Sequence, residues 1–391
     1  MLQNYASDLS DLLADIQRNI ENPKIGLELV VAFFESDNQV LKSCDDSYGN
    51  VGEVFRYDAT ELFTHYARDI EDKSYLSDLV FKLYEEDEYG VREELVDYAS
   101  QFLPEEALYS LAQRFWENAE NIDKTAKDSQ YDARHSLFAV ESLARQLHDA
   151  PLFERAALAT WPDLSSKTCL DIAEVYLEAQ EPEKALDWIK KVPPEMALED
   201  YKRDKLLLDI YRKIDNQEKL AEVAWRIFRQ HKDVDNLEEL LSIIGEDQRE
   251  KVIAETSQEI MANPSSFYYD ISFLLDTNQV DLAQKYVLEN EDTLNGDQYG
   301  LMLTLAQRFE KENRFLVSTI IYRELLESIL RRAQSKYYQY GVRYLKKLEK
   351  LAPQVSDWQG VLPHELYFKK IAETHARKKS FWDKYEREEQ K

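Results

Sequence analysis

Apolar residues recur every three or four positions along most of the chain, as in amphipathic helices. In residues 169–192 two such stripes are separated by a polar turn at residues 180–183. The stripes consist of Leu170, Ala173, Tyr176 and Leu177, then Ala185, Leu186, Trp188 and Ile189. Pro182 suits the first turn of the second helix, where its missing N–H has no intrahelical partner. This stretch therefore predicts two short helices joined by a tight turn.

The same arrangement recurs towards the C-terminus, with polar turns at residues 215–217, 277–278 and 312–313. Small residues occupy the equivalent position of the second stripe in four segments, at Ala185, Ala221, Ala283 and Ser318. They are 36, 62 and 35 residues apart, and the middle step fits two units, with a degenerate repeat around residues 243–260. Periods of this size predict stacked helix pairs of the tetratricopeptide kind. The alternative is an irregular all-helical domain whose spacing is a coincidence.

The remaining segments also predict helices. We expect them at about 9–20, 25–41, 54–70, 75–86, 91–102, 104–118, 133–147 and 151–160 before the repeats, and at about 336–351, 364–376 and 377–388 after them. Residues 43–52 predict a loop, and the polar segment 117–132 predicts a mobile connection. Nine glycines, ten prolines and no strand-like alternation favour an all-α fold. We predict an α-solenoid with an N-terminal helical region (1–165), helical repeats (166–330) and a C-terminal helical cap (331–391).

Charge and composition exclude several classes of protein. The net charge of −27 argues against general affinity for nucleic acid or an anionic membrane, and favours a basic partner. Residues 331–391 carry 15 Lys and Arg against 8 Asp and Glu, a net +7, so the other 330 residues carry −34. Cys44 and Cys169 offer no disulfide framework or zinc spacing, and no signal peptide or apolar run of membrane length is present. We expect a cytoplasmic protein.

Two adjacent carboxylates in the predicted loop are the first candidate site. Asp45, Asp46 and Ser47 precede Gly49 in a stretch rich in turn residues. Such carboxylates would hold Mg²⁺ or Ca²⁺ through oxygen ligands, although the spacing differs from that of the EF-hand. The alternative is that these side chains accept backbone N–H bonds and cap the next helix.

A basic, aromatic cluster near the C-terminus is the second candidate. His364 and His375 are 11 residues apart and are accompanied by Trp358, Tyr367, Arg377, Lys378, Lys379 and Trp382. Aromatic rings stack on bases and cations bind phosphate, so the cluster would form a patch for an anion or nucleic acid. The alternative is a packed cap in which the cations lie over aromatic faces. Two histidines alone do not make a zinc site.

Both candidate regions carry a family resemblance. The segment LKSCDDSYGNVGEVF, the later EDEYG, and the ending LPHELYFKKIAETHARKKSFW resemble an uncharacterised bacterial all-helical family catalogued as a domain of unknown function. Similar segments occur in proteins with SWIM-type zinc fingers, but this chain lacks the Cys-x-Cys pair and the later Cys-x-His of that finger. The resemblance implies recurring elements at Asp45, Asp46, Ser47, Gly49, His364, His375, Arg377, Lys378, Phe381 and Trp382, and implies no activity.

Together these patterns favour a non-catalytic helical-repeat scaffold that binds a protein partner, and the charge favours a basic one. No catalytic residue and no cofactor is expected. One alternative is a nucleic-acid-associated protein that uses the basic segment 331–391. A second alternative is a metal-dependent enzyme with Asp45 and Asp46 as ligands.

Overall fold

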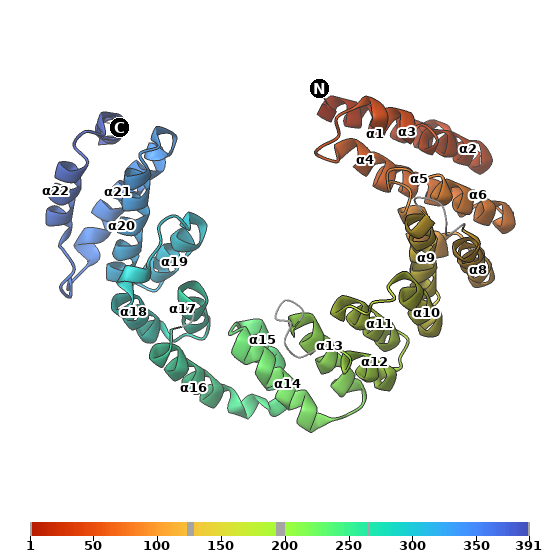
Figure 1. Ribbon diagram of the computed structural model, residues 1–391. Helices are drawn as coiled ribbons and strands as arrows, with labels where there is room; N and C mark the ends of the chain where they lie inside the picture. Colours follow the sequence, from red (N-terminus) through yellow and green to blue (C-terminus); the bar gives the residue numbers. More distant parts are fainter. Residues whose placement is uncertain (1, 123–128, 193–199, 265, 390–391) are drawn as a thin grey trace. The chain divides into compact units, whose positions relative to one another are not determined.

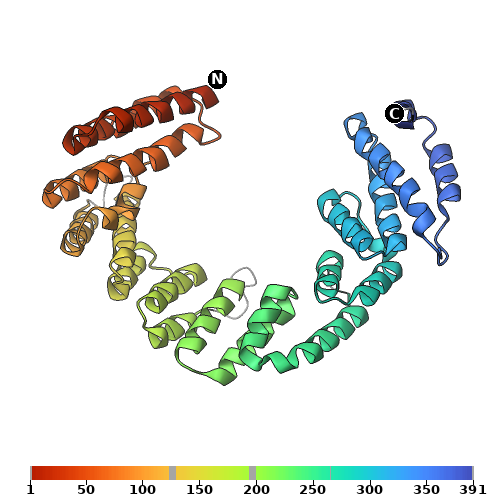
Figure 2. The ribbon, with the colours of Figure 1, turned by 180° about the vertical axis from the view of Figure 1, so that it is seen from behind.

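The computed structural model describes residues 2–122, 129–192, 200–264 and 266–389, and these residues form helices joined by turns, with no β-strand among them (Figures 1 and 2). The predicted all-α class is therefore confirmed. The chain divides into two compact units, residues 1–216 and residues 217–391. This boundary lies inside the segment 166–330, and the three-part division of the chain stays a prediction.

Unit 1 contains thirteen helices in its described part. They are α1 (Leu2–Asn19), α2 (Pro23–Phe34), α3 (Asp37–Ser43), α4 (Asn50–Glu53), α5 (Thr60–Ala67), α6 (Lys73–Glu85), α7 (Glu94–Asp97), α8 (Glu105–Asn121), α9 (Ser129–Gln146), α10 (Ala150–Thr160), α11 (Ser166–Glu178), α12 (Pro182–Ile189) and α13 (Asp200–Lys213). Consecutive helices pack side by side in α8 to α10 and in α11 to α13, as Figure 1 shows.

Unit 2 contains ten helices in its described part. They are α14 (Gln217–Gln230), α15 (Val234–Ile244), α16 (Arg249–Ala262), α17 (Phe267–Asp276), α18 (Val280–Glu289), α19 (Tyr299–Lys311), α20 (Phe315–Arg332), α21 (Tyr338–Leu351), α22 (His364–Thr374) and α23 (Lys379–Glu389). Helix α20 packs against α18, α19 and α21, and its side chains are buried along most of its length. It is the central helix of this unit.

Three stretches differ from the sequence expectation. The helix predicted at 25–41 is divided into α2 and α3 by a turn at residues 35–36, where the hydroxyl of Ser36 donates to the Phe33 carbonyl (2.6 Å). The helix predicted at 91–102 is reduced to α7 and a 3₁₀ turn (Ala99–Gln101). In the polar segment 117–132, α8 continues to Asn121 and α9 begins at Ser129, while residues 123–128 lie outside the described part.

One turn geometry joins helices at five places. A residue with left-handed backbone follows the first helix at His148 (φ 52°), Gln180 (φ 61°), Asp215 (φ 54°), Asn278 (φ 60°) and Asn313 (φ 59°). These residues are 32, 35, 63 and 35 positions apart. The three later turns and the turn at Gln180 fall where the sequence predicted polar turns.

The backbone hydrogen bonds of these turns are also equivalent. In each, the N–H after the left-handed residue donates to the carbonyl five positions earlier, as from Glu181 to Tyr176 (2.9 Å) and from Arg314 to Phe309 (2.8 Å). This is the Schellman pattern, which satisfies the last carbonyls of a helix. In each of these helix pairs, the first helix thus ends with the same hydrogen-bonded turn.

Many polar contacts join residues whose separation in the sequence is close to the spacing of 32 to 35 residues between successive turns. The contacts within unit 1 include Arg145–Glu178 (2.8 Å) and Lys202–Asp171 (2.8 Å), and those within unit 2 include Arg308–Asp276 (2.6 Å), Arg314–Asp281 (2.6 Å) and Lys347–Glu310 (2.6 Å). The partners are 31 to 37 residues apart. These contacts join α9 to α11 and α11 to α13 within unit 1, and α17 to α19 and α19 to α21 within unit 2.

Candidate functional site

The Asp-Asp-Ser loop between α3 and α4 caps a helix. Asp46 accepts hydrogen bonds from the backbone N–H groups of Val51 (3.0 Å) and Gly52 (2.8 Å) through its two carboxylate oxygens. Asp45 accepts from the hydroxyl of Ser47, and Gly49 has the left-handed backbone (φ 73°) that the tight turn requires. Both carboxylates are thus used inside the loop.

The EDEYG segment forms a second loop of the same kind beside the first. Asp87 accepts from the backbone N–H groups of Tyr89 (3.1 Å), Val91 (3.2 Å) and Arg92 (2.8 Å). The guanidinium of Arg56, in the helical segment after α4, donates to the Gly90 carbonyl (2.7 Å). Lys42 of the first family motif also pairs with Glu88 of the second (2.9 Å), so the two motifs are in contact.

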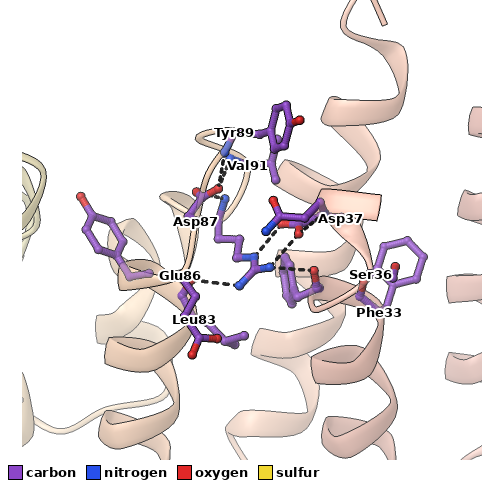
Figure 3. A network of polar contacts seen from close by, with 12 residues as sticks. Phe33, Ser36, Asp37, Leu83, Glu86, Asp87, Tyr89 and Val91 are labelled. Carbon is purple, nitrogen blue, oxygen red and sulfur yellow. Dashed lines mark hydrogen bonds and ion pairs between the residues drawn. The ribbon is translucent and has the colours of Figure 1, made fainter. Parts of the chain in front are cut away.

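A buried ion pair anchors this loop to α3, and Figure 3 shows it. Arg92 is 2% exposed and Asp37 is fully buried. The guanidinium donates from Nε (2.6 Å) and Nη2 (2.7 Å) to the two carboxylate oxygens of Asp37. Nη1 donates to the Leu83 carbonyl (3.2 Å), and Nη2 also donates to the Phe34 carbonyl (3.0 Å). The pair ties α2, α3 and α6 together, which explains why the chain is broken at Ser36.

The geometry of these loops favours the capping interpretation over the metal interpretation. Among the described residues, no group of three or more His, Cys, Asp or Glu side chains converges as a metal site would require. Asp46 already has two backbone donors, one on each oxygen. The polar side chains of this region stabilise the packing of the first helices of unit 1.

The C-terminal motif residues lie in and around α22 and α23. Phe381 is fully buried and lies against Gly341 of α21, where a side chain larger than hydrogen would meet the ring. The indole of Trp382 donates to the His375 carbonyl (3.0 Å), and its ring packs edge to face with Phe368. These aromatic residues attach α23 to the rest of unit 2.

The two histidines do not form one site. His364 is the first residue of α22, whereas His375 follows its last residue, Thr374. Burial lowers the pKa of each imidazole, with the Arg323 guanidinium adding to the effect at His364 and Lys378 at His375. Arg377 is exposed to solvent. The structure therefore separates the predicted basic, aromatic cluster into a packed part and an exposed part.

An open pocket of about 610 Å³ lies between α20, α22 and the loop that precedes α22. Its apolar lining consists of Leu288, Leu294, Ile320, Val361 and Leu362, and its charged lining of Arg323, Lys370, Glu291, Glu324 and Glu327. We call this the Arg323 pocket. All of these residues belong to unit 2.

Arg323 is a charged residue among the buried, mostly apolar residues of α20. Its side chain is 7% exposed, and its guanidinium carbon lies 4.2 Å from the centre of the Tyr367 ring and 5.1 Å from that of Trp358. Among the described residues, no group accepts a hydrogen bond from its Nε or Nη2. Burial lowers the pKa of this guanidinium, and it raises the pKa of the Tyr367 phenol, as does the nearby Glu327 carboxylate.

Sequence reasoning missed Arg323, Asp37 and Arg92. A sequence signal exists for Arg323, because it interrupts the run of apolar residues that makes α20 the central helix. No spacing rule links Asp37 to Arg92, which are 55 residues apart. The Trp358 and Tyr367 rings were assigned to the C-terminal cluster, and the structure places both around Arg323.

The observations so far define an all-helical protein with repeated helix-to-helix turns. None of the helices in the described part is both long and apolar enough to cross a membrane. The chain matches the model of the family of unknown function DUF6880 over residues 2–384, and it belongs to that family. No curated protein matches the chain.

Proposed function

We propose that this chain is an α-solenoid of tetratricopeptide-like helix pairs that acts by binding another protein. The observation that carries the proposal is the recurrence of one turn geometry, from His148 to Asn313, together with polar contacts between residues 31 to 37 positions apart. Repeats that contact only their neighbours build extended surfaces, and such surfaces typically bind a peptide or a helix.

A tyrosine-lined pocket in unit 2 is the surface we assign to the partner. It has a volume of about 250 Å³, and its lining consists of Tyr299, Tyr337, Tyr340, Tyr344 and Arg332 together with Gly296, Leu303, Leu325 and Ile329. We call it the tyrosine pocket. Tyrosine and arginine are enriched at the centres of protein interfaces because they offer large contact areas with polar ends.

Charge favours a basic partner. The chain carries a net charge of −27, and the −34 outside residues 331–391 would attract a basic partner over a longer range than the +7 of the segment that supplies Tyr337, Tyr340 and Tyr344. In addition, the rings of the tyrosine pocket already accept cations from this chain, with Lys336 4.8 Å from the centre of the Tyr337 ring and Arg343 5.6 Å from that of Tyr340. A lysine or arginine of a partner would interact with exposed rings in the same way.

The test begins with affinity purification of the tagged full-length chain from its native cells, followed by mass spectrometry and binding measurements with the purified partner. The disruptive variant combines Tyr299→Ala with Tyr340→Ala. The matched control is Tyr269→Ala, because Tyr269 and Tyr299 are both 66% exposed and Tyr269 lies outside the tyrosine pocket.

We expect the wild-type chain and the control to retain the same protein, and the double variant to bind it at least about thirtyfold more weakly, as for truncation of interface hot spots. Binding should weaken as salt is added. Equal recovery by the double variant would rule out the tyrosine pocket. Recovery of nucleic acid in place of a protein, with a steep salt dependence, would instead support the alternative that uses residues 331–391.

A further inference from the structure

The tyrosine pocket offers hydrogen-bond donors and few dedicated acceptors. Its polar lining consists of the phenols of Tyr299, Tyr337, Tyr340 and Tyr344 and the guanidinium of Arg332. Among the described residues, no carboxylate, carboxamide or imidazole side chain lines it. A guanidinium only donates, whereas a phenol both donates and accepts. A ligand that presents acceptors and has no donors of its own therefore suits this lining.

The phenol hydroxyls are accessible to a ligand. Tyr299, Tyr340 and Tyr337 are 66%, 43% and 37% exposed, and no described residue forms a hydrogen bond with their phenol oxygens. Burial raises the pKa of the Tyr344 phenol, and the phenols of Tyr340 and Tyr299 raise it further, which places these three hydroxyls near one another. Several donors thus converge on one pocket.

The rest of the lining is apolar. Leu303 of α19 and Leu325 and Ile329 of α20 complete it, together with Gly296. Flat aromatic rings beside aliphatic side chains accommodate the compact, apolar ring of proline, as in the aromatic-lined grooves that recognise proline-rich segments. Arg332 would repel a lysine or arginine inside the pocket, whereas proline is uncharged. The basic residues expected of the partner therefore lie outside the pocket itself.

A proline-rich segment also supplies the acceptors. Proline has no backbone N–H, so each proline contributes a carbonyl acceptor and no donor. In the polyproline II conformation these carbonyls make no internal hydrogen bonds and are open to the surroundings. The segment is already extended before it binds, so it loses little conformational entropy on docking.

We propose that the tyrosine pocket binds a proline-rich segment in the polyproline II conformation. Its proline rings lie against the tyrosine rings, and its carbonyls accept hydrogen bonds from the phenols and from Arg332. This inference rests on the proposed function, because it names the part of the protein partner that enters the same pocket. It excludes from this pocket an amphipathic helix, which is the other common ligand of such surfaces.

The experiment measures the binding of labelled peptides to the full-length chain by fluorescence anisotropy. The probe is nonaproline. The controls are an uncharged peptide of glutamine and alanine, the same peptide with lysine at every third position, and an amphipathic helical peptide. We expect nonaproline to bind at least about tenfold more tightly than each control. Its affinity should change little with added salt, because the probe carries no charge.

Tyr299→Ala combined with Tyr340→Ala removes two exposed rings of the pocket, and Tyr269→Ala is the matched control outside it. The double variant should bind nonaproline at least about tenfold more weakly, and the control should keep the wild-type affinity. Tyr299→Phe combined with Tyr340→Phe keeps both rings and removes both hydroxyls. It should weaken binding by about twofold to tenfold for each hydrogen bond lost.

Three results would overturn the proposal. One is an affinity for nonaproline no greater than that for the uncharged control. The second is tighter binding of the lysine peptide or the helical peptide, which would assign the pocket to a cation or to a helix. The third is unchanged nonaproline binding by a folded chain with Tyr299→Ala and Tyr340→Ala.

The partner obtained by affinity purification separates this inference from the proposed function. A partner that is lost by the double alanine variant, but still binds the wild-type chain after its proline-rich segments are deleted, would support the proposed function and refute the proline assignment. A partner that is retained by the double variant, although nonaproline is not, would refute the placement of the partner in the tyrosine pocket and support proline binding there.

Discussion

The buried ion pair of unit 1 gives the most direct test of the structure. The change Asp37→Ala removes both acceptors of Nε and Nη2 of Arg92, and leaves a guanidinium that is 2% exposed with only the carbonyls of Leu83 and Phe34 as partners. An uncompensated buried charge costs about 3–5 kcal/mol of folding free energy. That is a large share of the roughly 5–15 kcal/mol that stabilises a typical domain.

The assay is urea unfolding followed by circular dichroism, together with hydrogen exchange to assign the loss to unit 1. The double variant Asp37→Leu with Arg92→Met should recover most of the lost stability, because apolar side chains of similar size replace the buried pair at little cost. Lys42→Ala is the control, since its ion pair with Glu88 is more than half exposed on both sides and should contribute less than about 1 kcal/mol.

Two results would refute this reasoning. A loss of stability below about 1 kcal/mol for Asp37→Ala would mean that Arg92 reaches water or another acceptor. A double variant that is as unstable as the single one would mean that the side chains act through shape, and that charge compensation contributes little. Loss of protection confined to unit 2 would contradict the division of the chain.

Three further predictions follow from single features. Asp46→Ala should destabilise unit 1 by about 1 kcal/mol, because it removes the cap of α4. Mg²⁺ or Ca²⁺ should leave the melting temperature of the wild-type chain unchanged. A melting temperature that rises with either metal in the wild-type chain, but not in Asp46→Ala, would support the metal alternative. Gly26→Ala should cost about 1–3 kcal/mol in urea unfolding, because the added methyl would overlap the Tyr66 ring, and an unchanged midpoint would contradict the packing. Burial lowers the pKa of His364, so near neutral pH the folded chain binds fewer protons at this residue than the unfolded chain does. The stability that is present above the unfolded pKa of about 6.5 should therefore fall as the pH is lowered towards the folded pKa. The variant His364→Gln should reduce this pH dependence of the unfolding free energy between pH 7.5 and 5.5.

The sequence predicted the helices and most of the turns because both depend on neighbouring residues. Apolar spacing located the paired helices α11 and α12, and the polar residues at Asn278 and Asn313 marked turns that are left-handed in the structure. Asn is among the residues that tolerate this backbone, so these two turns had a local signal. The adjacent acids at Asp45 and Asp46 suggested both a cap and a metal site, and the sequence alone offered no way to choose.

The features that sequence reasoning missed depend on residues far apart in the chain. The break between α2 and α3 follows from the burial of Asp37 against Arg92, and helical periodicity carries no information about that pairing. The Arg323 pocket is formed by α18, α20, α22 and a loop, so it exists only in the folded unit. The sequence shows Arg323 as a lone arginine within an apolar helical stripe. It does not show that Nε and Nη2 of this side chain have no hydrogen-bond acceptor among the described residues.

The contacts between residues 31 to 37 positions apart, which begin with Arg145–Glu178 and end with Glu310–Lys347, have a mechanical consequence. In the array of helix pairs that we propose, each pair would be held mainly by its sequence neighbour, so a chain pulled from its ends would lose the contacts of one pair at a time. One such segment of about 33 residues lengthens to roughly 110 Å when fully extended. Force–extension curves of a single molecule should therefore show a series of small unfolding steps of similar length. A domain whose core is formed by segments far apart in the sequence would instead unfold in one large step.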